Sequence, residues 1–122
     1  MHTSLIRDGD PEVRQRAAWD LGRESTNVKE AVLSLADALN DEFVDVRRQA
    51  MLSLFLHGHS SNIVRDRIVY FISDADLVLR RAAIATLCVL AEFIPIECHT
   101  IEEVLRQNDE MSLAIMKAYN VI

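Results

Sequence analysis

The histidines and cysteines are the side chains in this sequence that are best suited to binding a metal ion. His57 and His59 flank Gly58, and Cys98 and His99 form a second pair much further along the chain. A zinc site requires three or four ligands at suitable spacing, and a lone His-x-His pair supplies only two. We therefore interpret these histidines as polar turn or surface residues, and we predict neither a metal nor a cofactor.

Motifs for catalysis are also lacking. The sequence contains no Gly-rich phosphate loop, no nucleophile elbow and no HExxH motif. Its carboxylates are spread along the chain as expected for solvated helix faces. Cys88 is expected to be an inert core thiol and Cys98 a partly exposed one, and nothing marks either as an activated nucleophile. We predict that the protein is not an enzyme and that it has no catalytic residues.

Length and composition limit the class of protein. The chain has 122 residues, half of them hydrophobic, with three glycines and two prolines, which favours one globular domain over disorder or a turn-rich β sandwich. Its net charge of −6 disfavours nucleic-acid binding, because phosphate contacts require cations, and it suits a basic protein partner. Two cysteines without a CxxC motif, no signal peptide and no apolar run of about 18 residues predict a cytoplasmic protein without a membrane span.

A pattern of polar and apolar residues recurs every 33 residues, and the structural elements of this repeat must position the side chains described above. A gapless shift by that length aligns three aspartates, three arginines and five sets of apolar residues. The columns are Asp8, Asp41 and Asp74; Arg14, Arg47 and Arg80; Val13, Val46 and Leu79; Ala17, Ala50 and Ala83; Leu21, Leu54 and Leu87; Leu35, Ile68 and Ile101; and Leu39, Ile72 and Leu105. The chain is therefore predicted to be one domain of residues 1–122, with repeats at about 8–40, 41–73 and 74–106.

Each repeat is predicted to contain two helices, because apolar residues recur within it at helical spacing. The first helices are placed at 11–23, 44–57 and 77–92, and the second helices at 28–39, 62–73 and 96–106. Asp10 followed by Pro11 indicates a helix start, and Asp76 takes the same place in the third repeat. Phe43 cannot cap the second repeat, which leaves Asp41 as the alternative. Gly58 is expected to end the first helix of that repeat.

Three segments carry a resemblance to a known family. The segments 8–22, 41–50 and 74–83 resemble HEAT repeats, and are most similar to the short HEAT-like kind also found in phycobilisome lyases. The resemblance covers about residues 6–106 and implies an all-α, right-handed α-α superhelix. It further implies that the first helices line the convex face, that the second helices line the concave face, and that the repeated Asp and Arg form a structural ladder between neighbouring repeats.

The ends of the chain depart from the repeat. Leu5 and Ile6 align with the end of a second helix whose beginning is missing. Residues 109–120 are predicted to form one degenerate helix without the arginine. This helix either caps the stack with a polar outer face or presents apolar surface to a partner, and we favour the cap.

Two surfaces are candidates for binding a partner. On the second helices, a mainly acidic face is expected around Tyr70 and Phe71, since exposed aromatic residues within a charged rim are typical of interface hot spots; Phe71 can equally pack into a neighbouring helix. This face comprises Glu30, Leu33, Asp37, Asp66, Arg67, Tyr70, Phe71, His99 and Glu103. The rival patch, on the first helices, comprises Trp19, Leu52 and Leu56, with Trp19 set between Arg16 and Arg23.

The favoured function is a non-catalytic module that binds a protein partner through the acidic face, and a basic protein is one candidate for that partner. A narrower hypothesis is a bacterial toxin-immunity protein, because an acidic inhibitor would be steered toward a basic nuclease toxin. The alternative class is ligand handling of the bilin-lyase type, which the resemblance to phycobilisome lyases implies. The oligomeric state is left open.

Overall fold

The computed structural model describes residues 5–90, with the exception of the Cys88 side chain. This part of the chain is helical and contains no strand. The predicted second helix of the third repeat (96–106) and the predicted terminal helix (109–120) lie outside the described residues. The elements are α2 (Pro11–Leu21), α3 (Val28–Ala38), α4 (Val44–His57), η1 (Gly58–Val64), α5 (Arg65–Val69), η2 (Tyr70–Ser73) and α6 (Leu77–Leu90).

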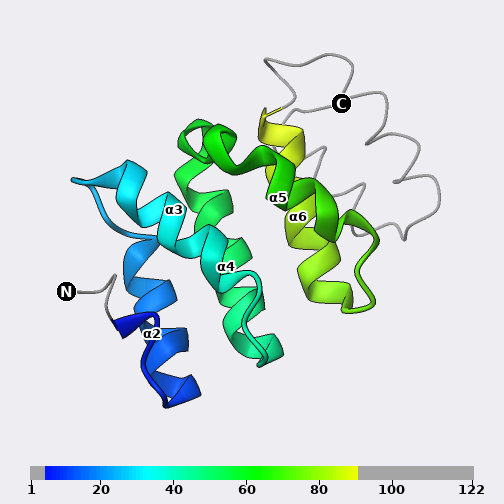
Figure 1. The fold of residues 1–122 in the computed structure, drawn as a ribbon. Helices are drawn as coiled ribbons and strands as arrows, with labels where there is room; N and C mark the ends of the chain where they lie inside the picture. Colours follow the sequence, from blue (N-terminus) through cyan, green and yellow to red (C-terminus); the bar gives the residue numbers. More distant parts are fainter. Residues whose placement is uncertain (1–4, 91–122) are drawn as a thin grey trace.

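These elements form two layers. The first helices of the repeats, α2, α4 and α6, lie side by side in chain order, and α4 packs against both of the others (Figure 1). The second layer consists of α3 and the segment from η1 to η2. A hydrophobic core fills the space between the layers, as the amphipathic stripes on both kinds of helix require. The all-α stack predicted from the sequence is confirmed.

The aligned apolar columns form this core. In the first layer, Val46, Ala50 and Leu54 are at most 1% exposed, and their counterparts in the other repeats are buried too, apart from half-buried Val13. In the second layer, α3 and α5 bury the predicted stripe, and only Ile72 is half-buried. The buried members there are Ala31, Val32, Leu35, Leu39, Val64 and Ile68.

Most helix boundaries follow the predicted signals. Asp10 accepts a hydrogen bond from the Glu12 amide at the start of α2, and Asp76 accepts one from the Leu79 amide at the start of α6. Gly58 ends α4 with φ +56° and ψ −125°, a conformation that residues with a Cβ rarely adopt. The regular helices agree with the predicted ranges to within about two residues, which is the usual uncertainty of helix ends.

The second helix of the second repeat differs from its prediction. One helix was expected over 62–73, but the chain forms two 3-10 segments around the short α5. The side chain of Ser61 donates a hydrogen bond to the Leu54 carbonyl, which ties the 3-10 segment η1 back onto α4. Ile63, Val64, Ile68, Val69 and Ile72 are β-branched, and β-branched residues weaken helix propensity. No side chain caps α5, so little favours one continuous helix.

The first two helices of the first layer approach closely at Gly22. A Cβ placed on this residue would lie 2.4 Å from the Ser53 Oγ and 3.1 Å from the Ser53 Cα. Ser53 is fully buried in α4 and donates a 2.7 Å hydrogen bond to the Ala18 carbonyl of α2. Glycine is needed here for the close approach of the two helices, not for its backbone conformation.

The repeated Asp and Arg shape the turn before each first helix. The arginine Nη1 donates to the carbonyl of the aspartate six residues earlier in all three repeats, at 2.7, 2.8 and 3.1 Å. Each aspartate side chain also accepts the amide two residues later, an Asx turn. Asp41 therefore serves this turn, as Asp8 and Asp74 do, and it does not cap α4, whose N-cap residue Phe43 makes no side-chain hydrogen bond.

Within residues 5–90 the structure describes two steps between repeats, and the first of them follows the ladder that the resemblance implies. Arg14 and Asp41 pair with an Nε–Oδ2 distance of 2.7 Å, and both side chains are at most 10% exposed. Burial of the Asp41 carboxyl acts to raise its pKa, but the hydrogen bonds from Arg14 and the Phe43 amide outweigh it and the pKa lies below its ordinary value. The repeated arginines are thus structural, as expected.

The ion pair between the second and third repeats involves different positions of the repeat. Arg48, one residue beyond the repeated arginine, pairs with Asp76 at 2.9 Å between Nε and Oδ2. The hydrogen bond from Arg48, with a further one from the Leu79 amide, lowers the pKa of Asp76 to about 2. The reason lies in the third repeat, which carries a second carboxylate at Asp76 where the second repeat has Phe43. The prediction of one uniform ladder was therefore wrong in register.

Candidate functional site

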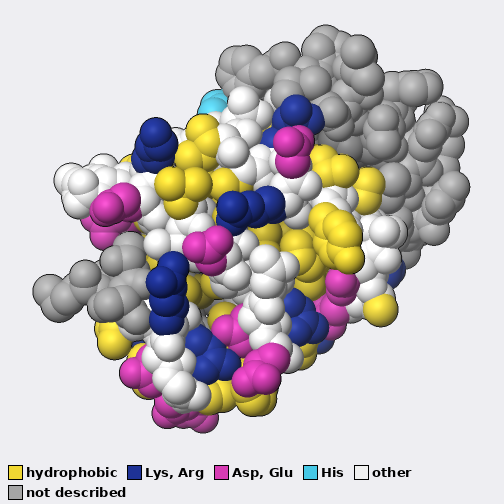
Figure 2. Space-filling view, viewed as in Figure 1, with side chains coloured by type: hydrophobic (Ala, Val, Ile, Leu, Met, Phe, Trp, Pro, Cys, Tyr) yellow, Lys and Arg dark blue, Asp and Glu magenta, His cyan; other side chains and the backbone are white. Residues whose placement is uncertain are grey.

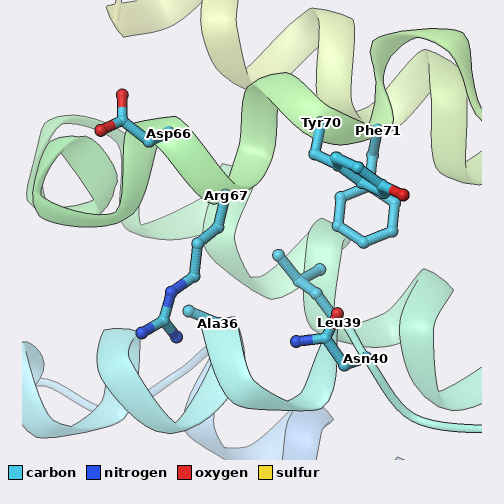
Figure 3. Close-up of a pocket in the computed structure, with 7 residues that line it drawn as sticks. All are labelled: Ala36, Leu39, Asn40, Asp66, Arg67, Tyr70 and Phe71. Carbon is cyan, nitrogen blue, oxygen red and sulfur yellow. The ribbon is translucent and has the colours of Figure 1, made fainter.

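A groove opens in the second layer between α3 and α5. Its volume is about 300 Å³. The residues that line it are Ala36, Leu39 and Asn40 from the end of α3, and Asp66, Arg67, Tyr70 and Phe71 from α5 and η2 (Figure 3). The groove exists because α5 is short and pairs with α3 less closely than the first helices pair with one another.

Tyr70 and Phe71, the aromatic pair predicted at the centre of this face, take different positions. Tyr70 is 78% exposed, whereas Phe71 is 6% exposed and belongs to the hydrophobic core. Their rings meet edge to face, with centroids 5.4 Å apart, so the buried ring of Phe71 supports the exposed one. The expectation that Phe71 is an exposed contact residue is corrected. The Phe71 side chain lies in the core, and of the two aromatic residues only Tyr70 exposes its ring to a partner.

Arg67 bridges the other end of the groove. Its guanidinium extends from α5 toward α3 beside Ala36 (Figure 3) and pairs with Asp37 at 2.9 Å between Nη1 and Oδ1. Arg7 approaches the same Asp37 carboxylate at 3.8 Å. Because Asp37 already has cationic neighbours, it adds little negative charge to the face.

The face is therefore mixed in charge where an acidic one was expected. Figure 2 shows acidic and basic side chains interspersed over this side of the molecule, with hydrophobic patches between them. Asp66, whose side chain is 95% exposed, lies 3.7 Å from Arg65 between Oδ1 and Nη2. The physical reason is that α5 itself brings Arg65 and Arg67 to both sides of Asp66. Residues 5–90 carry thirteen acidic and eleven basic side chains, so the acidity is concentrated in 91–122, with six acidic and two basic.

The remaining predicted residues of this face are placed as follows. Glu30 is exposed on α3, and Leu33 is 40% exposed on the same helix. Ile63, which the repeat columns did not single out, is 54% exposed in η1. His99 and Glu103 lie outside the described residues. Leu39 was assigned to the core, and neither Ala36 nor Asn40 was singled out, so the sequence did not reveal that the end of α3 forms one wall of a groove.

The rival patch lies on the first layer. Trp19, Leu52 and Leu56 are 37%, 41% and 56% exposed. As expected, Trp19 lies against Arg16 and Arg23, whose guanidinium carbons are 5.0 and 3.4 Å from the ring centroid. These two contacts already use much of the ring. A second hollow of about 220 Å³ beside Trp19 is lined mainly by polar side chains, namely Glu12, Gln15, Arg16 and Gln49.

A metal site is not assembled in the part of the chain that is described. There, no three side chains of His, Cys, Asp or Glu come together as metal ligands would. The His57 Nε2 is 2.7 Å from the Leu21 carbonyl oxygen, so this histidine joins α4 to the end of α2. Cys98 lies outside the described residues. No helix within residues 5–90 is long and apolar enough to cross a membrane.

The comparison with known families follows this geometry. The family model described as HEAT repeats matches residues 2–88, which is most of the chain and spans both layers. A search of curated proteins gave no match. HEAT repeats commonly mediate protein–protein interaction and are generally non-catalytic scaffolds. With its 33-residue repeat, two helical layers and core columns, the chain belongs to the HEAT repeat family.

Proposed function

We propose that this protein is a non-catalytic module that binds a protein partner through the groove between α3 and α5. The observation that carries the proposal is Tyr70, a large aromatic side chain that is 78% exposed at the edge of a groove of about 300 Å³. Aromatic residues next to concave, partly apolar surface are enriched among the residues that dominate interface energies.

The groove is a better candidate than the patch around Trp19. The Trp19 ring is covered by two guanidinium groups of its own helix segment, so a partner would have to displace them or bind over them. Tyr70 contacts one ring, that of Phe71, and offers the rest of its surface. The buried side chains of Leu39 and Phe71 lie beneath the groove beside it, and the exposed Asn40 supplies an amide that can both donate and accept hydrogen bonds.

The charge of the whole chain supports a basic partner. Asp66 and Glu30 are exposed on the binding layer, and residues 91–122 add a net charge of −4. A negative field of this kind accelerates the approach of a basic protein, while the groove itself is nearly balanced. The narrower form of the proposal is inhibition of a basic toxin in the manner of an immunity protein, which the small size and net charge support. We do not propose bilin handling, since no observation on residues 5–90 favours it.

The test is capture of partners from the native source by wild-type protein and by two matched variants. Tyr70→Ala removes the exposed aromatic of the second layer, and Trp19→Ala removes that of the first. We expect one partner to bind the wild type and the Trp19 variant and to be lost with Tyr70→Ala. A partner that is lost only with Trp19→Ala would place the interface on the first layer and refute the groove as the site.

A further inference from the structure

The three first helices begin at one edge of the molecule, the lower edge in Figure 1. The turns before these helices, together with the first residues of each helix, form a surface that we call the turn edge, namely residues 8–12, 41–45 and 74–78. Eight of the thirteen acidic residues of 5–90 lie in these three segments, and no basic residue does. Figure 2 shows acidic side chains gathered along this edge, with hydrophobic side chains beside them. The negative charge of the described residues is therefore concentrated here and not on the second layer.

The arginines that neutralise part of this charge lie further in. Arg14, Arg47 and Arg80 donate to carbonyls of the three turns, and each of them is buried or half-buried. Arg48, also half-buried, pairs with Asp76. Other carboxylates of the turn edge are exposed and form no ion pair within residues 5–90. These are Asp8, Asp10, Glu12 and Glu42. A partner that approaches the turn edge therefore meets negative charge first.

Phe43 occupies the place in the second turn where the other two turns carry a capping aspartate. Asp10 and Asp76 each accept a backbone amide at the start of their helices, whereas Phe43 leaves α4 without a side-chain cap. The replacement is unfavourable twice, because a cap is lost and a large apolar ring is 46% exposed. The ring centroid lies 5.5 Å from the Arg14 guanidinium carbon, near the outer limit of a cation–π contact. A local rule that is broken for so little gain is expected at functional positions.

We propose that the turn edge docks a segment of a protein partner that contains both basic and apolar side chains, with Phe43 as the apolar anchor. The exposed carboxylates attract such a segment, and the Phe43 ring packs against its apolar groups. Leu77 and Val78, which are 39% and 43% exposed at the start of α6, add apolar surface in the third repeat. An exposed aromatic residue within a charged rim is typical of an interface hot spot.

The turn edge adjoins the groove but does not overlap it. The chain passes directly from Asn40 in the groove wall to the second turn, and from Ser73 at the end of η2 to the third. None of the residues that line the groove belongs to the turn edge. This second surface goes beyond the proposed function, because it assigns the attraction of a basic partner to carboxylates outside a groove that is itself nearly balanced in charge.

Two fluorescein-labelled peptides of equal length provide the test, with binding to the purified full chain measured by fluorescence anisotropy. One peptide contains arginine and leucine, the other arginine and glycine, and the wild type should bind the first more tightly. Glu12→Gln combined with Glu42→Gln should raise the dissociation constant of the arginine–leucine peptide about fivefold at low salt. The matched control, Asp20→Asn combined with Glu24→Gln, removes the same charge at the opposite end of α2 and should leave the constant within about twofold.

Phe43→Asp separates the apolar anchor from the charge. The aspartate restores the capping residue of the other two repeats, so the melting temperature should not fall, and it adds one negative charge to the turn edge. Attraction by charge alone would tighten the binding of both peptides. The proposed anchor requires the opposite for the arginine–leucine peptide, whose dissociation constant should rise about fivefold or more. The constant of the arginine–glycine peptide should stay unchanged or fall.

The proposal is overturned if the wild type binds neither peptide or binds both equally, or if Phe43→Asp does not weaken binding of the arginine–leucine peptide. An equal loss from the edge variant and its control would also overturn it, because binding would then follow net charge alone. Circular dichroism of each variant verifies the fold. The proposed function has a separate readout, since capture through the groove depends on Tyr70. A partner that is lost with Tyr70→Ala but retained by the edge variants would keep the groove and exclude the turn edge from that interface.

Discussion

The two helical layers of this protein are built from the same 33-residue repeat but differ in regularity. In the first layer, α2, α4 and α6 are continuous helices that contact their neighbours directly. In the second layer, α3 is continuous, whereas its counterpart is divided into η1, α5 and η2. The first layer has a close contact at Gly22 and a buried ion pair between Arg14 and Asp41, and the second has a groove and, among residues 5–90, the most exposed aromatic residue, Tyr70. The difference is the reason why we expect the first layer to dominate stability and why we propose the second as the binding surface.

Side-chain chemistry at equivalent positions explains this difference. Along each stripe the first layer carries a valine or leucine, then an alanine, then a leucine, and the small alanines allow helices to approach. The second repeat replaces Ala31 and Val32 of α3 with Val64 and Arg65, and its β-branched residues do not favour a long helix. The second helix of the second repeat is therefore interrupted, whereas the first helix of the same repeat, α4, is continuous.

Truncation in the first layer should have the largest effect. Leu54→Ala removes a side chain that is fully buried in α4, and should lower the free energy of unfolding by about 3 kcal/mol through lost burial and the cavity left behind. Leu52→Ala on the same helix, where the side chain is 41% exposed, should cost much less. Urea denaturation followed by circular dichroism measures both. Equal costs would contradict the division between buried and exposed faces of α4.

The close contact in the first layer gives the next largest effect. Gly22→Ala places a Cβ against the Ser53 Oγ and Cα, so α2 and α4 must separate, at a cost of about 2 kcal/mol. The double variant Gly22→Ala with Ser53→Gly should recover part of this loss, because it removes the side chain that collides. Gly9→Ala is the control, since a Cβ there meets nothing within 4 Å. Thermal melts of the four proteins test the contact, and an unaltered Gly22→Ala melt would disprove it.

Acid should weaken the ion pair between the second and third repeats. Because the pKa of Asp76 is about 2 in the folded protein and near 3.8 when unfolded, its contribution is fully present above pH 4 and is lost as the pH falls toward 2. The contribution should be about 1–2 kcal/mol. Asp76→Asn retains an oxygen that can accept from the Leu79 amide but loses the charge, so unfolding free energies at pH 5 and pH 2 should differ less in this variant. An unchanged pH dependence would assign the acid sensitivity to other carboxylates.

The smallest effect on stability is expected at the groove. Tyr70→Ala should change the free energy of unfolding by at most about 0.5 kcal/mol, since the ring is 78% exposed, even though partner capture is expected to be lost. Phe71→Ala, one residue further on, should destabilise by about 3 kcal/mol because this ring is buried. Similar losses of stability for the two variants would mean that Tyr70 is a packing residue and not a binding one.

Several features could be derived from the sequence because they depend on local periodicity. The 33-residue register identified the core columns, the first-layer helices and α3 to within about two residues, and the end of α4 at Gly58. The structural assignment of Arg14, Arg47 and Arg80 followed from the family resemblance. The position of Trp19 between Arg16 and Arg23 was also anticipated, because residues three and four apart on a helix lie on the same face.

Other features depend on contacts between repeats, which a column of aligned residues does not contain. The alignment treated Phe71 and Tyr70 alike, and the ending of α5 as 3-10 helix decided which ring turns inward. It placed Asp37 on an acidic face as an unpaired carboxylate, whereas Arg67 of the next repeat pairs with it. It expected one ladder of Asp and Arg, whereas Asp76 moves the second ion pair to Arg48.

The sequence by itself determined that this protein is a stack of two-helix HEAT repeats, because the hydrophobic period and the turn residues are local properties that repeat without gaps. Only the tertiary structure decided where the proposed binding site lies. The groove, the exposure of Tyr70 and the neutralised Asp37 arise from the spacing between α3 and α5, and that spacing depends on how a short, interrupted helix packs onto the core.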